Sequence, residues 1–167
     1  MMHKIIGSIL VILACTGIGF ARGHDLQIHL KELEELKRIF LWIRSEIQYN
    51  KIPFSEVFWK IENKTSGNFK LWLQTLADSL EKRDKHTFQE LWESSITKCL
   101  KETLLSKEER KELKDIGTGL AYIETIEVYL EQLEIRIQRA REDTTSKQKI
   151  YQSMGVMSGI FLIILLL

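Results

Sequence analysis

Proline and cysteine are scarce in this sequence, and neither sign of charge is in excess. The chain has one Pro and two Cys. A single proline leaves long stretches with nothing to break a helix, and two cysteines are too few for a disulfide framework. The 24 Lys and Arg face 23 Asp and Glu, for a net charge of +1. This balance excludes the concentrated basic surface with which proteins bind nucleic acid.

Nearly all the charged residues lie in the middle of the chain. Residues 5–21 and 154–167 contain none, and a membrane-spanning helix needs about 20 predominantly apolar residues. We therefore predict transmembrane helices at residues 1–21 and 151–167, flanking a domain of residues 22–150. Each segment is short for a span, but two of them on one chain favour membrane anchors.

The distribution of basic residues orients the chain. Lys and Arg are numerous on the domain side of both apolar segments, whereas Lys4 alone lies beyond them. The positive-inside rule then places the domain in the cytoplasm. An alternative stays open at the N-terminus, because Ala14–Cys15 after an apolar stretch also fits a signal peptide or a lipoprotein box. The domain would then be an extracytoplasmic lipoprotein or sensor anchored at Cys15.

The domain has the pattern of helices almost throughout, and we expect an all-α bundle of about six. Apolar residues recur every three or four positions over residues 26–50, which is typical of a helix with one buried face. They are Leu26, Leu33, Leu36, Phe40, Ile43 and Ile47. A heptad repeat, as in coiled coils, marks the last helix between Ile123 and Ala140. Both helices lead into predicted spans, so they should pack in antiparallel orientation.

Shorter helices are expected between these two. Capping boxes at Thr87–Glu90 and Ser106–Glu109 predict two helix starts. Turns are predicted at Ser66–Gly67–Asn68 and at Gly117–Thr118–Gly119. The four tryptophans lie mostly beside apolar stripes and are interpreted as core residues: Trp42, Trp59, Trp72 and Trp92.

The sequence contains no motif of a known catalytic or metal site. Gly117–Thr118–Gly119 lacks the features of a phosphate-binding loop. His24 and His29 are five residues apart and so do not share a helix face as metal ligands would. The pairs Glu34–Glu35 and Glu108–Glu109 point about 100° apart on a helix, so we expect solvated faces. Neither a catalytic residue, a metal nor a cofactor is predicted, and an enzyme is disfavoured.

Four stretches resemble the stage III sporulation protein AB family of endospore-forming bacteria. They are GSILVILACTGIGF (7–20), RSEIQYNKIPFSEVF (44–58), LKDIGTGL (113–120) and YQSMGVMSGIFLIILLL (151–167). Gly117 stands where the family has a turn glycine before its last helix. Ala121 stands near the family's second glycine, and the loop there is shortened, so its contacts are expected to differ.

The resemblance implies a subunit of the engulfment-stage channel between mother cell and forespore. The family's soluble part is similar to the F-type platform proteins of type II secretion and type IV pilus machines. By this likeness the chain is a non-enzymatic platform in the outer forespore membrane. Its partners would be the sporulation AA ATPase in the mother-cell cytoplasm, other channel subunits and membrane lipid, with homo-oligomers left open. The candidate partner-binding residues are Glu46, Tyr49, Pro53, Glu56 and Gly117.

Overall fold

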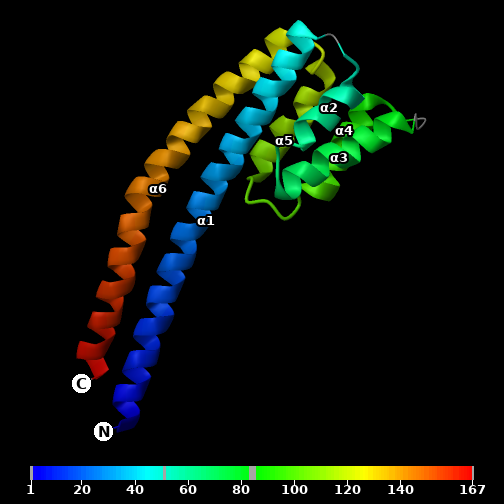
Figure 1. Cartoon of the computed structure of the whole chain (residues 1–167). Helices are drawn as coiled ribbons and strands as arrows, with labels where there is room; N and C mark the ends of the chain where they lie inside the picture. The colour runs from blue at the N-terminus through cyan, green and yellow to red at the C-terminus, as the bar shows by residue number, and fades with distance from the viewer. Residues whose placement is uncertain (1, 51, 83–85, 167) are drawn as a thin grey trace. The chain divides into compact units, whose positions relative to one another are not determined.

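The structure of the chain is a computed structural model, and its described residues form six α-helices, one 3₁₀ helix and no strand (Figure 1). It describes the backbone of residues 2–50, 52–82 and 86–166, and the side chains of residues 21–50, 52–82, 86–146, 150, 153 and 157. The elements are α1 (Met2–Tyr49), α2 (Phe54–Glu62), α3 (Gly67–Glu81), α4 (Phe88–Cys99), α5 (Lys107–Asp115), η1 (Ile116–Gly119) and α6 (Ile123–Leu166). This confirms the predicted all-α class with about six helices.

The chain divides into two compact units, residues 1–31 with 137–167, and residues 32–136. In the first unit the early part of α1 and the late part of α6 run in opposite directions (Figure 1), and the Thr144 hydroxyl lies 3.5 Å from the Leu26 carbonyl oxygen. Within the part of the chain whose side chains are described, no helical stretch combines the length and hydropathy that a membrane crossing needs. The predicted spans at residues 1–21 and 151–167 lie almost entirely outside that part and stay predictions.

In the second unit, ion pairs show how α1 and α6 run along each other. Lys37 pairs with Glu134, and the Arg44 Nη1 atom lies 3.6 Å from Glu127 Oε1. From the first pair to the second, the α1 residue number rises by seven while the α6 residue number falls by seven. The two helices are therefore antiparallel here, which is the orientation that the sequence predicted.

The predicted apolar stripes supply the core of this unit. The α1 side chains that are completely buried include Leu33, Leu36, Phe40 and Ile43, and α6 contributes the buried Ile126, Leu130 and Leu133. Each fully buried side chain of this size contributes about 1.5–3 kcal/mol relative to an exposed one. Leu26 and Ile47, at the ends of the predicted α1 stripe, are half-buried.

Trp92 of α4 lies at the centre of an aromatic cluster. Its ring centroid is 5.0 Å from that of Trp72, 5.9 Å from Phe88, 6.2 Å from Phe58 and 6.4 Å from Phe40. Edge-to-face and offset pairs at such distances attract each other beyond their area of burial. Trp72 and Trp92 are completely buried, as the sequence predicted, whereas Trp42 and Trp59 are half-buried.

Both predicted capping boxes are present. The Thr87 backbone N–H donates to Glu90 Oε2 at 2.8 Å, and the Ser106 N–H donates to Glu109 Oε2 at 2.7 Å, with the reciprocal bonds also formed. Each cap contributes about 1 kcal/mol by satisfying amides that a helix start leaves free. At the turn predicted for residues 66–68, α3 already begins at Gly67, whose φ of +58° favours glycine.

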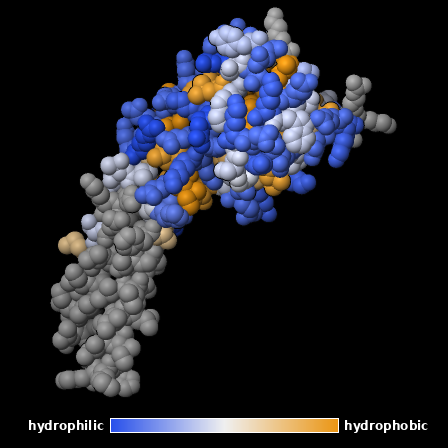
Figure 2. All heavy atoms as spheres, in the orientation of Figure 1, coloured by the Kyte–Doolittle hydropathy of each residue, from blue (hydrophilic) through white to orange (hydrophobic). Residues whose placement is uncertain are grey.

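The surface of the second unit is mainly hydrophilic in the view of Figure 2, with small apolar areas between charged side chains. Several large apolar side chains are nevertheless exposed, among them Tyr49, Leu71, Tyr122, Val128 and Ile135. Tyr49, at 74% exposure, is the most exposed large apolar side chain in the described part of the chain. It lies at the end of α1, within the group of residues that the sequence marked as candidates.

Candidate functional site

Four of the five predicted partner-binding residues lie where α1 ends and α2 begins, a surface that we call the α1–α2 corner. Glu46 and Tyr49 are in the last turn of α1, Pro53 is the N-cap residue of α2, and Glu56 is in the first turn of α2. Pro53 has φ −58° and ψ 146°, and its carbonyl oxygen accepts from the Val57 N–H at 3.1 Å. Proline is suited to this position, because no helical hydrogen bond requires its missing N–H.

Glu46 ties the end of α1 to the side of α2. Its Oε2 atom accepts from Asn50 Nδ2 at 2.6 Å and from Lys60 Nζ at 3.3 Å. The hydrogen bond from Asn50, followed by that from Lys60 and the charges of Lys60 and Lys64, lowers the pKa of this carboxyl below its usual value. Glu46 is thus an anion that links the end of α1 to Lys60 of α2 through a surface ion pair.

The other three corner residues point to solvent. Tyr49, Pro53 and Glu56 are all exposed, and Glu56 forms no ion pair with any described residue. An exposed tyrosine is the kind of side chain that is enriched at protein interfaces, whereas carboxylates are more common at their rims. Chemically, the arrangement suits recognition of another protein.

Sequence reasoning missed two residues of this surface. Trp42, one turn before Glu46, is half-buried, and the Lys64 Nζ atom lies 5.4 Å from its ring centroid in a cation–π contact. Trp42 was predicted to be a core residue from its position in the apolar pattern. The spacing from Trp42 to Glu46 is one helical turn, which was a signal for a shared face, but the arrival of Lys64 depends on tertiary structure.

Gly117, the fifth predicted residue, is not at the α1–α2 corner. It is buried in η1, and a Cβ atom there would lie 2.4 Å from Gln89 Oε1 and 2.5 Å from Trp92 Cδ1. The same two side chains bind the last carbonyls of α5, with Trp92 Nε1 donating to Leu113 at 2.7 Å and Gln89 Nε2 to Lys114 at 3.1 Å. Gly117 therefore lets α4 approach the end of α5. Its predicted role in partner binding stays a prediction.

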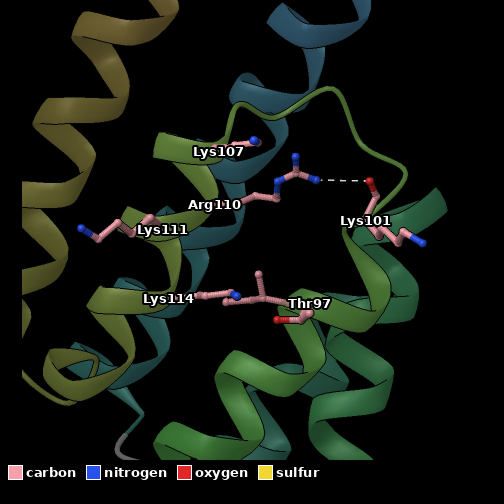
Figure 3. A pocket seen from close by; sticks show the side chains of 7 residues that line it. Thr97, Lys101, Lys107, Arg110, Lys111 and Lys114 are labelled. Carbon is pink, nitrogen blue, oxygen red and sulfur yellow. Dashed lines mark hydrogen bonds between the residues drawn. The ribbon is translucent and has the colours of Figure 1, made fainter.

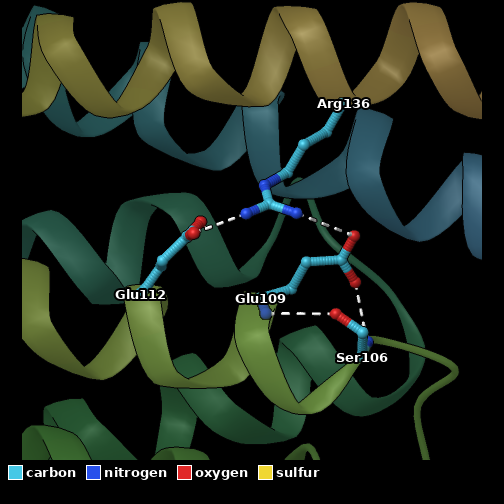
Figure 4. Close-up of polar contacts among 4 residues, drawn as sticks. All are labelled: Ser106, Glu109, Glu112 and Arg136. Atoms are coloured by element: carbon cyan, nitrogen blue, oxygen red, sulfur yellow. Dashed lines mark hydrogen bonds and ion pairs between the residues drawn. The ribbon is translucent and has the colours of Figure 1, made fainter.

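The pairs Glu34–Glu35 and Glu108–Glu109 are predicted from the sequence to lie on solvated faces, and for one residue of each pair this prediction is wrong. Glu35 and Glu109 are buried, whereas Glu108 is exposed. Arg136 of α6 reaches between Glu109 and Glu112 of α5, with its Nη1 atom 3.9 Å from Glu109 Oε1 and a hydrogen bond from Nη2 to Glu112 (Figure 4). The causes differ: Glu35 pairs with Arg38 one turn further along α1, whereas the Glu109 carboxylate accepts from the Ser106 N–H and also faces Arg136 of α6. This network fastens α5 to α6.

Catalytic chemistry has little basis in the described residues. No group of three or more His, Cys, Asp or Glu there could hold a metal ion. Cys99 is buried, with its Sγ atom 3.5 Å from Thr75 Oγ1. Tyr129 is buried against Phe40, and burial together with the nearby Glu112 raises the pKa of its hydroxyl. Such a tyrosine stays neutral, as a core residue does.

The comparison with protein families decides the assignment. The sequence profile of the family described as stage III sporulation protein AB matches residues 4–167. The chain belongs to this family. Stage III sporulation protein AB of Bacillus subtilis (strain 168) is 23% identical over 172 residues, which cover 99% of this chain and 100% of that relative. No solved structure matches the chain. Membership in the stage III sporulation protein AB family supports a role in sporulation and agrees with the resemblance drawn from the sequence.

Proposed function

We propose that this chain is a non-enzymatic membrane platform subunit of a sporulation channel, which couples a cytoplasmic ATPase to the channel between mother cell and forespore. The family match over residues 4–167 is the observation that carries the proposal. The uncharged segments at residues 5–21 and 154–167 serve as anchors in the outer forespore membrane. The basic residues between them keep the helical domain in the mother-cell cytoplasm.

The α1–α2 corner is the proposed contact with the ATPase. Tyr49, Pro53 and Glu56 are exposed there, and the bond between Glu46 and Lys60 holds the two helices that carry them. A surface whose helices are already held together loses less conformational entropy on binding. The corner lies at the end of α1, which is a single helix from Met2 to Tyr49. Packed helices transmit a displacement better than loops do.

The test is binding of the ATPase to the full-length chain in neutral detergent micelles. Tyr49→Ala combined with Glu56→Lys removes the exposed ring and reverses the charge at the corner. Tyr122→Ala combined with Glu124→Lys is a matched control, because Tyr122 is 65% exposed and Glu124 occupies the first turn of its own helix. We expect the corner variant to lose at least about tenfold in affinity and the control to keep wild-type affinity.

Two results would refute the proposal in different ways. If the wild-type chain does not bind the ATPase either in micelles or in membranes, the platform function is wrong. If both variants weaken binding to the same extent, the platform function survives but the corner is not the contact.

A further inference from the structure

A groove between α4 and α5 collects positive charge without a matching negative charge. It has a volume of about 360 Å³ and lies within the second unit. Its lining residues are Ile96, Thr97, Lys101, Lys107, Arg110, Lys111 and Lys114. Figure 3 shows Lys107, Arg110 and Lys114 extending from α5 towards α4, whereas the Lys111 side chain extends from the other side of α5. No acidic side chain lines this groove, which we call the α4–α5 groove.

Two of the four acidic residues of α5, Glu109 and Glu112, pair with Arg136 of α6, whereas Glu108 and Asp115 are exposed. The basic residues of α5 at positions 107, 111 and 114 follow the spacing i, i+4, i+7. Among the described residues, these three lysines and Lys101 form no ion pair. Like charges one helical turn apart repel each other, so an anionic partner in the groove would relieve an unfavourable arrangement.

Arg110 is held in a fixed position in the middle of the groove. Its Nη1 atom donates to the Leu100 carbonyl oxygen at 3.3 Å and to that of Lys101 at 3.2 Å, at the end of α4. Helix ends leave carbonyl groups without partners, and a guanidinium group satisfies them while its positive charge stays in place. The groove therefore contains one cation that is held by two hydrogen bonds, with lysines on either side.

The arrangement does not suit a small phosphate ligand. Many phosphate sites combine cationic side chains with backbone N–H groups at a helix start or in a glycine-rich loop. At the start of α5, the Glu109 N–H already donates to Ser106 Oγ at 3.1 Å, and the Ser106 N–H donates to the Glu109 carboxylate. The groove therefore offers the Arg110 guanidinium and lysine side chains in place of these two backbone N–H groups, and the lysines act on carboxylates as point charges.

The neighbouring surface of α4 disfavours an anionic lipid bilayer. Thr97 also lines a shallow depression on α4, together with Glu90, Glu93, Ser94 and Lys98. The surface therefore changes across Thr97, from basic over α5 to a region of mixed charge along α4 in which the carboxylates outnumber the lysine. A uniformly anionic bilayer would be repelled by that second half, whereas a protein segment of matching charge pattern would be oriented by it.

We propose that the α4–α5 groove binds an acidic segment of a partner protein, with its carboxylates against Lys107, Arg110 and Lys114. This goes beyond the platform function, because the surface differs from the α1–α2 corner. The binding strength depends on ionic strength, since the lysines are mostly exposed and their charges are screened by salt.

The probe is a fluorescently labelled alanine-based helical peptide with Glu at i, i+4 and i+7, measured by anisotropy on the full-length chain in neutral micelles. The groove variant is Lys107→Gln, Lys111→Gln and Lys114→Gln together, which keeps Arg110 and its carbonyl contacts. The charge-matched control is Lys31→Gln, Lys82→Gln and Arg139→Gln, three exposed residues outside the groove. We expect the groove variant to bind about tenfold more weakly and the control within twofold of wild type.

Three outcomes would overturn the proposal. Equal weakening in both variants would mean non-specific attraction by net charge. Competition by millimolar inorganic phosphate beyond the effect of its ionic strength would indicate a small-anion site. Binding to phosphatidylglycerol vesicles that is lost in the groove variant, without loss of peptide binding, would indicate a membrane-facing surface. Circular dichroism of both variants checks that the helices are intact, so that loss of binding reports on the groove.

Discussion

Replacing Gly117 by alanine would add a methyl group that clashes with two neighbouring side chains. The added Cβ atom would lie 2.4 Å from Gln89 Oε1 and 2.5 Å from Trp92 Cδ1. Trp92 is fully buried, with the Trp72 ring centroid 5.0 Å away, so it has little room to move. Overpacking of this kind costs about 1–3 kcal/mol.

The same displacement would also disturb hydrogen bonds at the end of α5. Trp92 donates to the Leu113 carbonyl oxygen and Gln89 to that of Lys114. Each such bond contributes about 1 kcal/mol to stability. Taking one bond as lost, we expect Gly117→Ala to lower the free energy of unfolding by about 3 kcal/mol.

The assay is urea denaturation of the full-length chain in neutral micelles, followed by tryptophan fluorescence. With a slope of about 2 kcal/mol per molar urea, the midpoint should fall by roughly 1.5 M. Gly67→Ala is the control, because nothing lies within 4 Å of its added Cβ and only the φ of +58° is unfavourable. That strain costs about 1 kcal/mol. If Gly117→Ala destabilises the chain no more than the control does, the close approach is not what requires glycine at this position.

Three further predictions follow from other contacts. The pKa of Glu46 is lowered on folding, so its contribution to stability is present above about pH 4.5 and is lost as the pH falls through the pKa of the folded state. Glu46→Gln should therefore be less stable than wild type at pH 7, and the difference should vanish in acid. A difference that grows in acid would contradict this. Arg136→Met should lower the free energy of unfolding by about 2 kcal/mol, since it deprives the buried Glu109 of that partner, and adding Glu109→Gln should restore part of the loss in the same urea assay. A cysteine introduced at the exposed Lys82 should react with a membrane-impermeant thiol reagent only after the cells are lysed. The parent chain is the control, because its Cys99 is buried. Labelling in intact cells would favour the lipoprotein alternative.

Local signals made much of the fold predictable. A capping box depends on residues three positions apart, and both boxes formed as the sequence indicated. The apolar period of α1 identified Leu33, Leu36, Phe40 and Ile43 as core, because one face of a helix must be buried against a neighbour. The motif around residues 44–58 likewise brought Glu46, Tyr49, Pro53 and Glu56 together, since they are close in sequence on either side of one turn.

What the sequence by itself determined is therefore the set of helices, their buried faces and the family. Only the tertiary structure decided which charges are paired and which are free. Arg136 of α6 reaches Glu109 and Glu112 of α5, and Trp92 of α4 packs against Gly117, where it leaves no room for a side chain. These contacts join residues more than 20 positions apart, and neither periodicity nor spacing carries information at that range, since both describe one helix at a time.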